Sequence, residues 1–219
     1  NSTDAQSLLN YLGLNKAYAI GASLSDCANV LLGLQIAESM IVSGQAKNII
    51  LVSTNKAHPS PNSRKMSPEV AVSSDASVSM LVSSVAGGYR LLGTTLTKNE
   101  PTPDDAPPLD LSIKKIKGLR IATKNLLSKL NLTTDEIDKV FNSNYSDLSQ
   151  IFVESCGFEP EKGFYENLAK YSHCLAGDVL ITLKDQNDFI NLEEHILLIS
   201  DGPFGSYACL LYTSPSPRD

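Results

Sequence analysis

Hydrophobic and polar positions follow the same order in the two halves of the chain. Leucines spaced three and four residues apart indicate the end of an amphipathic helix at residues 7–14, and the pattern returns at residues 125–132. In both halves we then expect a strand, a strongly apolar helix and two further strands. These elements fall at residues 17–22, 28–43, 48–54 and 77–83 in the first half, and at 139–142, 175–183, 195–201 and 206–212 in the second. A repeat of this length predicts two structurally similar halves.

The helix expected at residues 28–43 is apolar around nearly its whole circumference, and Glu38 is its only charged residue. A helix of this kind has to be buried on all sides. In an α/β protein two sheets can enclose it, together with the similarly apolar helix at 175–183. With the amphipathic helices outside, the pattern predicts an α/β fold of five layers, α-β-α-β-α, with two pseudo-symmetric halves. The alternative, an ordinary three-layer α/β domain, is disfavoured by the repeat.

The domain organisation follows from the same pattern. Residues 1–98 are expected to form what remains of the N-terminal half, and residues 112–212 the C-terminal half. Residues 99–111, which include four prolines, predict a linker loop between them. Residues 213–219 follow an apolar strand abruptly and are interpreted as a non-native tail. The chain also begins inside a helical pattern, so we expect it to be a fragment.

Composition and charge narrow the function classes. Eighteen Lys and Arg against 24 Asp and Glu give the 219 residues a net charge of −6, which argues against nucleic acid as a partner. No apolar run approaches the roughly 18 residues of a membrane-spanning helix. The four cysteines show no Cys-x-x-Cys spacing, so we expect neither a disulfide scaffold nor a metal site, and a cytoplasmic location fits best. These cysteines are Cys27, Cys156, Cys174 and Cys209.

Cys27 stands where the strand at 17–22 has ended and the apolar helix begins, with Ser25 or Asp26 as the expected N-cap. The thiolate is the reactive form of cysteine, and the positive end of a helix favours it. Burial and the Asp26 carboxylate oppose it. Position alone therefore leaves a nucleophile and a small buried core residue equally open.

The segment from Cys27 to Gly44 resembles the nucleophile segment of β-ketoacyl-ACP synthase III and its thiolase-superfamily relatives. In that family the nucleophilic Cys opens a buried helix that ends in a Ser-Gly pair, and the offset of 17 residues matches. Residues 74–81 resemble the family's Gly-Asp-Gly-Ala-x-Ala segment, and residues 201–206 its glycine-rich turn between the last two strands. The resemblance covers residues 8–212, and the family's N-terminal βαβ portion has no counterpart in the sequence.

This resemblance implies a thiolase-like fold and an acyl-cysteine intermediate. The implied substrate is an acyl-CoA or an acyl-phosphopantetheine on an acyl carrier protein, and no permanently bound cofactor is implied. Because family members pair through the strand after the nucleophile helix, here residues 48–54, the resemblance also implies a homodimer.

The remaining site residues depart from the common family pattern. A His in a His-Gln-Ala-Asn segment and an Asn in a later Gly-Asn segment usually join the cysteine, but Asn142 and His173 stand at these two places. The change resembles a subgroup of synthase III-like acyltransferases in which one catalytic His precedes an Asp by five residues, as His173 precedes Asp178. The resemblance thus implies Cys27, His173 and Asp178 as the catalytic residues, with Asn142 as a possible accessory. This set suits the chemistry, since a thiol nucleophile needs a base and the base needs an orienting group.

Acyl transfer through a cysteine passes through an oxyanion that needs N–H donors. The Cys27 amide is one candidate, and the glycine-rich turn is expected to supply the other. Pro203 has no N–H, so the second donor is the amide of Phe204 or Gly205.

A single His paired with an Asp favours acyl transfer to an alcohol, amine or thiol, in lipid or secondary metabolism. Decarboxylative condensation stays open, because Asn142 and His173 form a donor pair in swapped order. Two further alternatives are a non-catalytic synthase-like partner subunit and a cysteine hydrolase of unrelated fold. His58 and His195 are expected to face solvent.

Overall fold

Most of the expected helices and strands form in the computed structural model, which describes residues 2–57, 59–60, 64–67, 71–85, 87–99 and 108–213. His58, the expected tail from residue 214 and most of the expected linker lie outside these residues. The helices are α1 (Ser2–Tyr11), α2 (Asn29–Val42), α3 (Pro108–Leu130), α4 (Leu148–Ser155), α5 (Glu166–Tyr171) and α6 (Asp178–Gln186). The strands are β1 (Asn48–Asn55), β2 (Lys65–Ser67), β3 (Ala71–Val72), β4 (Ala76–Ser83), β5 (Tyr89–Lys98), β6 (Lys139–Phe141), β7 (His195–Asp201) and β8 (Gly205–Thr213).

Successive side chains of β7 point to opposite faces of one sheet, and both faces belong to the hydrophobic core. β7 lies within a four-stranded sheet of order β5-β8-β7-β6, in which β6 runs parallel to β7 and β8 runs antiparallel to β7 and β5. Ile196 and Leu198 pack on one face, while Leu197 and Ile199 pack on the other. A strand that is buried on both faces needs a layer on each side.

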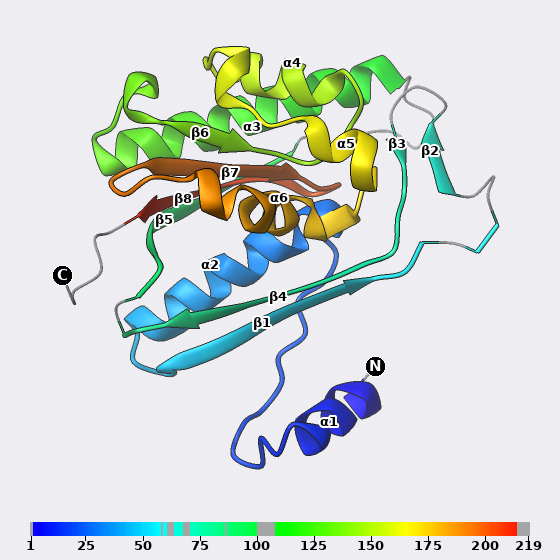
Figure 1. Cartoon of the computed structure of the whole chain (residues 1–219), viewed down its shortest axis with the longest axis vertical. Helices are drawn as coiled ribbons and strands as arrows, with labels where there is room; N and C mark the ends of the chain where they lie inside the picture. The colour runs from blue at the N-terminus through cyan, green and yellow to red at the C-terminus, as the bar shows by residue number, and fades with distance from the viewer. Residues whose placement is uncertain are drawn as a thin grey trace.

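One of these layers is the pair of apolar helices predicted from the sequence. α2 and α6 lie between the four-stranded sheet and the antiparallel pair β1–β4 (Figure 1). Leu31 and Leu34 of α2 are buried with Val179 and Leu183 of α6. The approach of α2 to β1 is so close that a Cβ on Gly33 would lie 2.3 Å from the Leu51 side chain. The prediction that both helices are enclosed between sheets is therefore confirmed.

The other face of the four-stranded sheet is covered by α3, which buries Leu119, Ala122 and Leu126 against it. The described residues thus form four layers: α3, the four-stranded sheet, the helices α2 and α6, and the pair β1–β4 (Figure 1). On the outward face of β1–β4, Ile50 and Leu81 are 55% and 64% exposed. The expected fifth layer, over this face, stays a prediction.

Several boundaries differ from expectation. Residues 17–22 form no strand, and Tyr18 and Ile20 are exposed, because no described strand lies beside the segment to complete a hydrogen-bond ladder. β5, which the repeat did not reveal, pairs along its length with β8. α3 begins at Pro108, inside the expected linker, since proline is well tolerated in the first turn of a helix.

The two halves do repeat around the apolar helices. A short 3-10 turn, Asp26–Ala28, leads into α2, and a second one, Leu175–Gly177, leads into α6. The first residue of each turn has a positive φ, 40° at Asp26 and 54° at Leu175. The matching turns place the starts of α2 and α6 side by side in the central layer.

Candidate active site

Cys27 lies in the 3-10 turn that precedes α2, and its side chain is 6% exposed. The positive φ of Asp26, just before it, is uncommon outside glycine and costs of order 1–3 kcal/mol. Ser25 occupies the N-cap of this 3-10 turn, one of the two residues expected there, but its side chain does not cap. Ser25 makes no capping bond because its hydroxyl pairs with the Tyr207 hydroxyl at 2.8 Å, and Ala28 occupies the N-cap of α2.

The end of β7 holds the Cys27 backbone in place. Ser200 donates its hydroxyl to the Cys27 carbonyl at 2.8 Å, and the Ser143 and Ser200 hydroxyls lie 3.0 Å apart. All three residues are buried. The nucleophile candidate is therefore anchored to the four-stranded sheet as well as to its own helix.

The structure brings Cys27, His173 and Asp178 into one chain of contacts. Cys27 Sγ lies 3.0 Å from Nε2 of His173, and His173 Nδ1 lies 2.5 Å from Oδ2 of Asp178. His173 and Asp178 are 0% and 1% exposed. With the carboxylate accepting from Nδ1–H, Nε2 is left to exchange a proton with the sulfur.

The Asp178 carboxylate is held by donors on both of its oxygens. Oδ2 accepts from the Asn144 amide at 2.8 Å, and Oδ1 accepts from the Cys174 amide at 2.7 Å. The Asn144 side chain adds a bond to Oδ1 at 3.2 Å. A carboxylate with this many donors is held in one position and can orient the imidazole.

The N-terminal half clamps the backbone of His173. The His173 amide donates to the Val72 carbonyl at 3.0 Å, and the Ser74 amide donates to the His173 carbonyl at 2.8 Å. The segment after β3 therefore sets the position of a histidine that belongs to the other half.

Burial and hydrogen bonding act in opposite directions on His173. Burial lowers its pKa, but the hydrogen bonds to Asp178 and Cys27, together with their negative charge, outweigh burial and raise the pKa to about 9. At neutral pH the imidazole is therefore protonated, and an imidazolium stabilises a neighbouring thiolate.

Asn142 is near these residues but is engaged elsewhere. Its side-chain nitrogen donates to the Ser149 carbonyl at 2.6 Å, and its side chain makes no described contact with Cys27 or His173. The structure thus does not bring the expected accessory residue to the thiol.

Two residues of the same segment, which the sequence reasoning missed, do reach the site. Asn144 binds the Asp178 carboxylate, and the Tyr145 ring centroid lies 4.5 Å from that of His173. Both follow β6, which ends at Phe141. Their position just after the carboxyl end of a parallel strand, where α/β proteins gather functional side chains, is the signal that would have found them.

The glycine-rich turn lies against the nucleophile segment. A Cβ on Gly202 would stand 2.3 Å from the Ser25 carbonyl oxygen, two residues before Cys27. Within the turn the Gly202 amide donates to the Gly205 carbonyl at 2.8 Å, and the Asn99 amide donates to the Phe204 carbonyl at 3.0 Å. The oxyanion role of the Cys27 amide and of the Phe204 or Gly205 amide stays a prediction.

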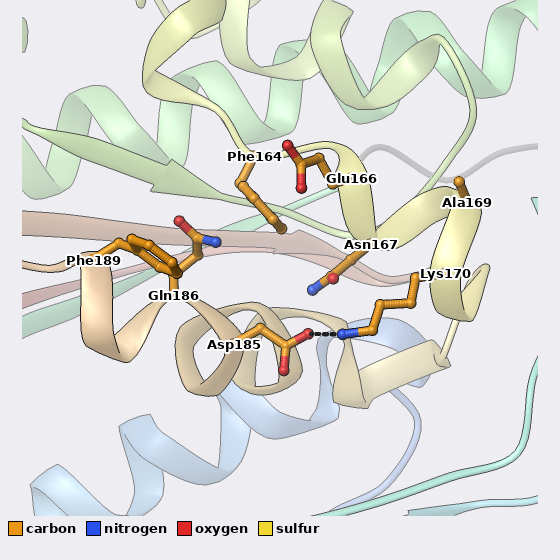
Figure 2. A pocket seen from close by; sticks show the side chains of 8 residues that line it. All are labelled: Phe164, Glu166, Asn167, Ala169, Lys170, Asp185, Gln186 and Phe189. Atoms are coloured by element: carbon orange, nitrogen blue, oxygen red, sulfur yellow. Dashed lines mark hydrogen bonds and ion pairs between the residues drawn. The ribbon is translucent and has the colours of Figure 1, made fainter.

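A cavity of about 550 Å³ lies between α5 and α6, away from these residues (Figure 2). Lys170 and Asp185, which line it, form an ion pair (Figure 2), with 3.3 Å between Nζ and Oδ2. Phe164 and Phe189 also line it, whereas Cys27, His173 and Asp178 do not. The cavity is thus separate from the candidate active site.

Three further features concern the described part of the chain. His195 is half-buried, with its Nδ1 3.0 Å from the Glu136 carbonyl, rather than fully solvent-facing. No group of three or more potential metal ligands is found among the residues described. None of the helices in the described ranges has the length and apolar character needed to cross a membrane.

The sequence matches no family model and no curated protein. Solved structures do match. The acyltransferase ChlB3 matches with a TM-score of 0.80 and 14% identity, over 98% of this chain and 74% of ChlB3. The 3-oxoacyl-acyl-carrier-protein synthase III of Aquifex aeolicus matches with a TM-score of 0.79 and 19% identity, over 95% of this chain and 71% of the synthase.

A variant of OleA from Xanthomonas campestris matches with a TM-score of 0.80 and 16% identity, over 95% of this chain and 69% of OleA. All three alignments span both halves of the chain, as the resemblance to β-ketoacyl-ACP synthase III led us to expect. The chain has the thiolase-like α/β fold that these synthase and acyltransferase structures share.

Proposed function

We propose that this chain is an acyltransferase that carries the acyl group as a thioester on Cys27. The observation that carries the proposal is the continuous series Cys27 Sγ, His173 and Asp178, with separations of 3.0 and 2.5 Å. In this proposal Cys27 is the nucleophile, His173 the base and Asp178 the group that orients the base. The donor is an acyl-CoA or an acyl carrier protein, and the acceptor offers an O–H, N–H or S–H group.

In the first half-reaction the Cys27 thiolate attacks the carbonyl carbon of the donor thioester. The new S–C bond pushes the carbonyl electron pair onto oxygen, where backbone amides stabilise it. The adduct then expels the donor thiolate, which takes the proton from Nε2 of the His173 imidazolium. Acyl-Cys27, a free donor thiol and a neutral imidazole result.

In the second half-reaction the neutral imidazole acts as the base. Nε2 of His173 takes the acceptor's proton as the acceptor atom attacks the acyl carbon. The C–S bond to Cys27 breaks, which returns the thiolate beside an imidazolium. The Asp178 carboxylate holds the ring in place and offsets its positive charge.

Simple acyl transfer is favoured over decarboxylative condensation by the placement of Asn142. Condensation needs two donors on the developing enolate, and the sequence offered Asn142 and His173 as that pair. In the structure one N–H of the Asn142 side chain donates to the Ser149 carbonyl, which turns the amide toward α4, and no described contact joins it to Cys27 or His173.

We also propose a homodimer in the cytoplasm. Within the described residues β1 pairs with β4 alone, so its other edge is available to a second copy. The free state of all four cysteines supports the reducing cytoplasm as the setting.

The test is intact-mass measurement after incubation with acetyl-CoA, octanoyl-CoA and malonyl-CoA in turn. We expect one acyl adduct per chain, its loss in Cys27→Ala and its retention in the control Cys174→Ala, whose sulfur contacts only a backbone carbonyl among its described partners. The adduct should be released on addition of an amine or alcohol acceptor.

The other outcomes identify the alternatives. Release of the acyl group to water without an acceptor indicates a hydrolase. Loss of carbon dioxide from malonyl-CoA with formation of a new C–C bond indicates a condensing synthase. Absence of any adduct on Cys27 indicates a non-catalytic partner subunit.

A further inference from the structure

Tyr145 carries a buried hydroxyl that is without a partner. The residue is 2% exposed, and its oxygen has no hydrogen-bond partner among the described residues. Burying a hydroxyl in this way costs about 1–3 kcal/mol, which a phenylalanine at the same place would avoid. Packing alone therefore gives no reason for a tyrosine, and a buried unsatisfied group calls for a ligand or a functional role.

The ring is held firmly from several sides. It packs edge-on against Phe152 at a centroid distance of 5.9 Å and lies 4.5 Å from the His173 ring. The Tyr145 amide donates to the Ser149 hydroxyl at 2.7 Å, which fixes the backbone. A hydroxyl on so constrained a ring is preorganised, and preorganised donors are those that stabilise developing charge best.

The hydroxyl lies beside the Cys27 side chain, with which it interacts. Tyr145 and Cys27 belong to the same buried cluster. Burial raises the pKa of Tyr145 well above its ordinary value, and the negative charges of Asp201 and Cys27, together with the contact between the hydroxyl and the Cys27 side chain, raise it further. The phenol therefore stays protonated, and it can donate a hydrogen bond beside Cys27 but does not give up its proton.

Lys115, a cation beside the Tyr145 ring, does not fill this role. Its Nζ lies over the Tyr145 ring face, 5.2 Å from the centroid, and forms an ion pair of 2.8 Å with Asp201. Lys115 thus neutralises a buried carboxylate beside the site and leaves the Tyr145 hydroxyl unpartnered.

We propose that the Tyr145 hydroxyl is a catalytic hydrogen-bond donor to the carbonyl oxygen of the acyl group that Cys27 attacks. This proposal rests on the proposed acyl-cysteine function and adds a side-chain donor to the backbone amides expected there. As the S–C bond forms, the carbonyl electron pair moves onto oxygen, and the O–H···O bond strengthens while the proton stays on Tyr145. No other bond to Tyr145 forms or breaks.

The test compares two reactions of Cys27 in the full chain. Acylation by acetyl-CoA passes through an oxyanion, whereas alkylation by iodoacetamide depends on the thiolate and forms none. In Tyr145→Phe we expect the single-turnover acylation rate to fall about 100- to 1,000-fold, as when an oxyanion donor is removed. The alkylation rate should change less than twofold.

The matched control is Tyr165→Phe, which removes a hydroxyl that does have a partner, the Pro160 carbonyl at 3.0 Å. Tyr165 packs against the same cluster, so this variant should lose stability and keep its acylation rate. Tyr145→Phe should unfold at the same urea concentration as the parent chain or at a higher one, since it removes an unsatisfied group.

Each remaining outcome rejects the role. Equal acylation rates in the parent chain and Tyr145→Phe overturn the Tyr145 proposal and leave the Cys27 function intact. Equal losses in acylation and alkylation show that Tyr145 acts on the thiolate or on the fold. A parent chain that alkylates at Cys27 but takes no acyl group overturns both proposals.

Discussion

His173 contacts Cys27, although 146 positions separate the two residues in the sequence, and its Nε2 lies 3.0 Å from the sulfur. The sulfur lies at the start of α2 in the first half, and the imidazole just before α6 in the second. The two helices share the central layer, so the repeated architecture brings their starts together. The site is therefore a property of the pair of halves.

Replacement of His173 by glutamine tests the base. Glutamine keeps polar atoms in the buried space but cannot take up a proton at neutral pH. We expect the acylation rate of Cys27 at pH 7 to fall about 100- to 10,000-fold, because glutamine neither stabilises a thiolate as an imidazolium does nor gives a proton to the departing thiol. Stopped intact-mass time courses from pH 6 to pH 9.5 measure this. An unchanged rate and profile would exclude His173 as the base.

Asp178→Asn preserves the shape of the orienting group and removes its charge. The amide also turns an NH₂ group toward N–H donors that now bind the carboxylate, including the amides of Asn144 and Cys174. We expect loss of stability and a fall in acylation rate of about 100-fold or more. Asp185→Asn, at an exposed ion pair with Lys170, is the control and should change neither. The idea fails if both variants acylate as fast as the parent chain.

The raised pKa of His173 predicts how stability depends on pH. The imidazole has an ordinary pKa of about 6.5 in the unfolded chain and about 9 in the folded chain. Its stabilising contribution is therefore fully present below pH 6.5 and is lost as pH rises through about 9. Urea unfolding should show the free-energy difference between the parent chain and His173→Gln shrinking by up to about 3 kcal/mol over this window. A constant difference would contradict the pKa shift.

Gly202 tests the contact between the glycine-rich turn and the nucleophile segment. A Cβ at this position meets the Ser25 backbone oxygen at 2.3 Å, so Gly202→Ala has to displace one of the two segments. We expect a loss of about 1–3 kcal/mol in unfolding free energy and a slower acylation of Cys27. Gly21→Ala, where a Cβ has nothing within 4 Å, is the control. Equal stability and acylation rates in both variants would contradict this contact as a constraint on the site.

The sequence was most informative where a residue pattern had a local cause. The uncharged surface around α2, interrupted only by Glu38, predicted its enclosure between sheets, and the five-residue offset from His173 to Asp178 predicted their contact. Residues 17–22 have a strand-like pattern, yet a strand also needs a neighbour, which no local pattern reveals. β5 was not predicted, because it has no counterpart in the repeated pattern.

Long-range contacts account for the site residues that were missed. The interpretation of the segment after β6 depended on its first residue, Asn142, because that position aligned with a family histidine. The fold instead turns Asn142 toward α4 and directs Asn144 and Tyr145 to the site. This arrangement depends on contacts with α4, which follows directly in the chain, and on the Asp178 carboxylate, which lies 34 positions after Asn144.

The pairing of β5 with β8 has a consequence for any attempt to divide the protein. β5 precedes the Pro-rich segment in the chain, yet it forms the border of the sheet to which β8 belongs. If the chain were cut between residues 98 and 108 and the pieces separated, β8 would lose its pairing with β5 at nine residue pairs. A long row of its amide and carbonyl groups would then be exposed and unpaired. Each piece would then tend to self-associate, so the two halves are interlocked parts of one folding unit.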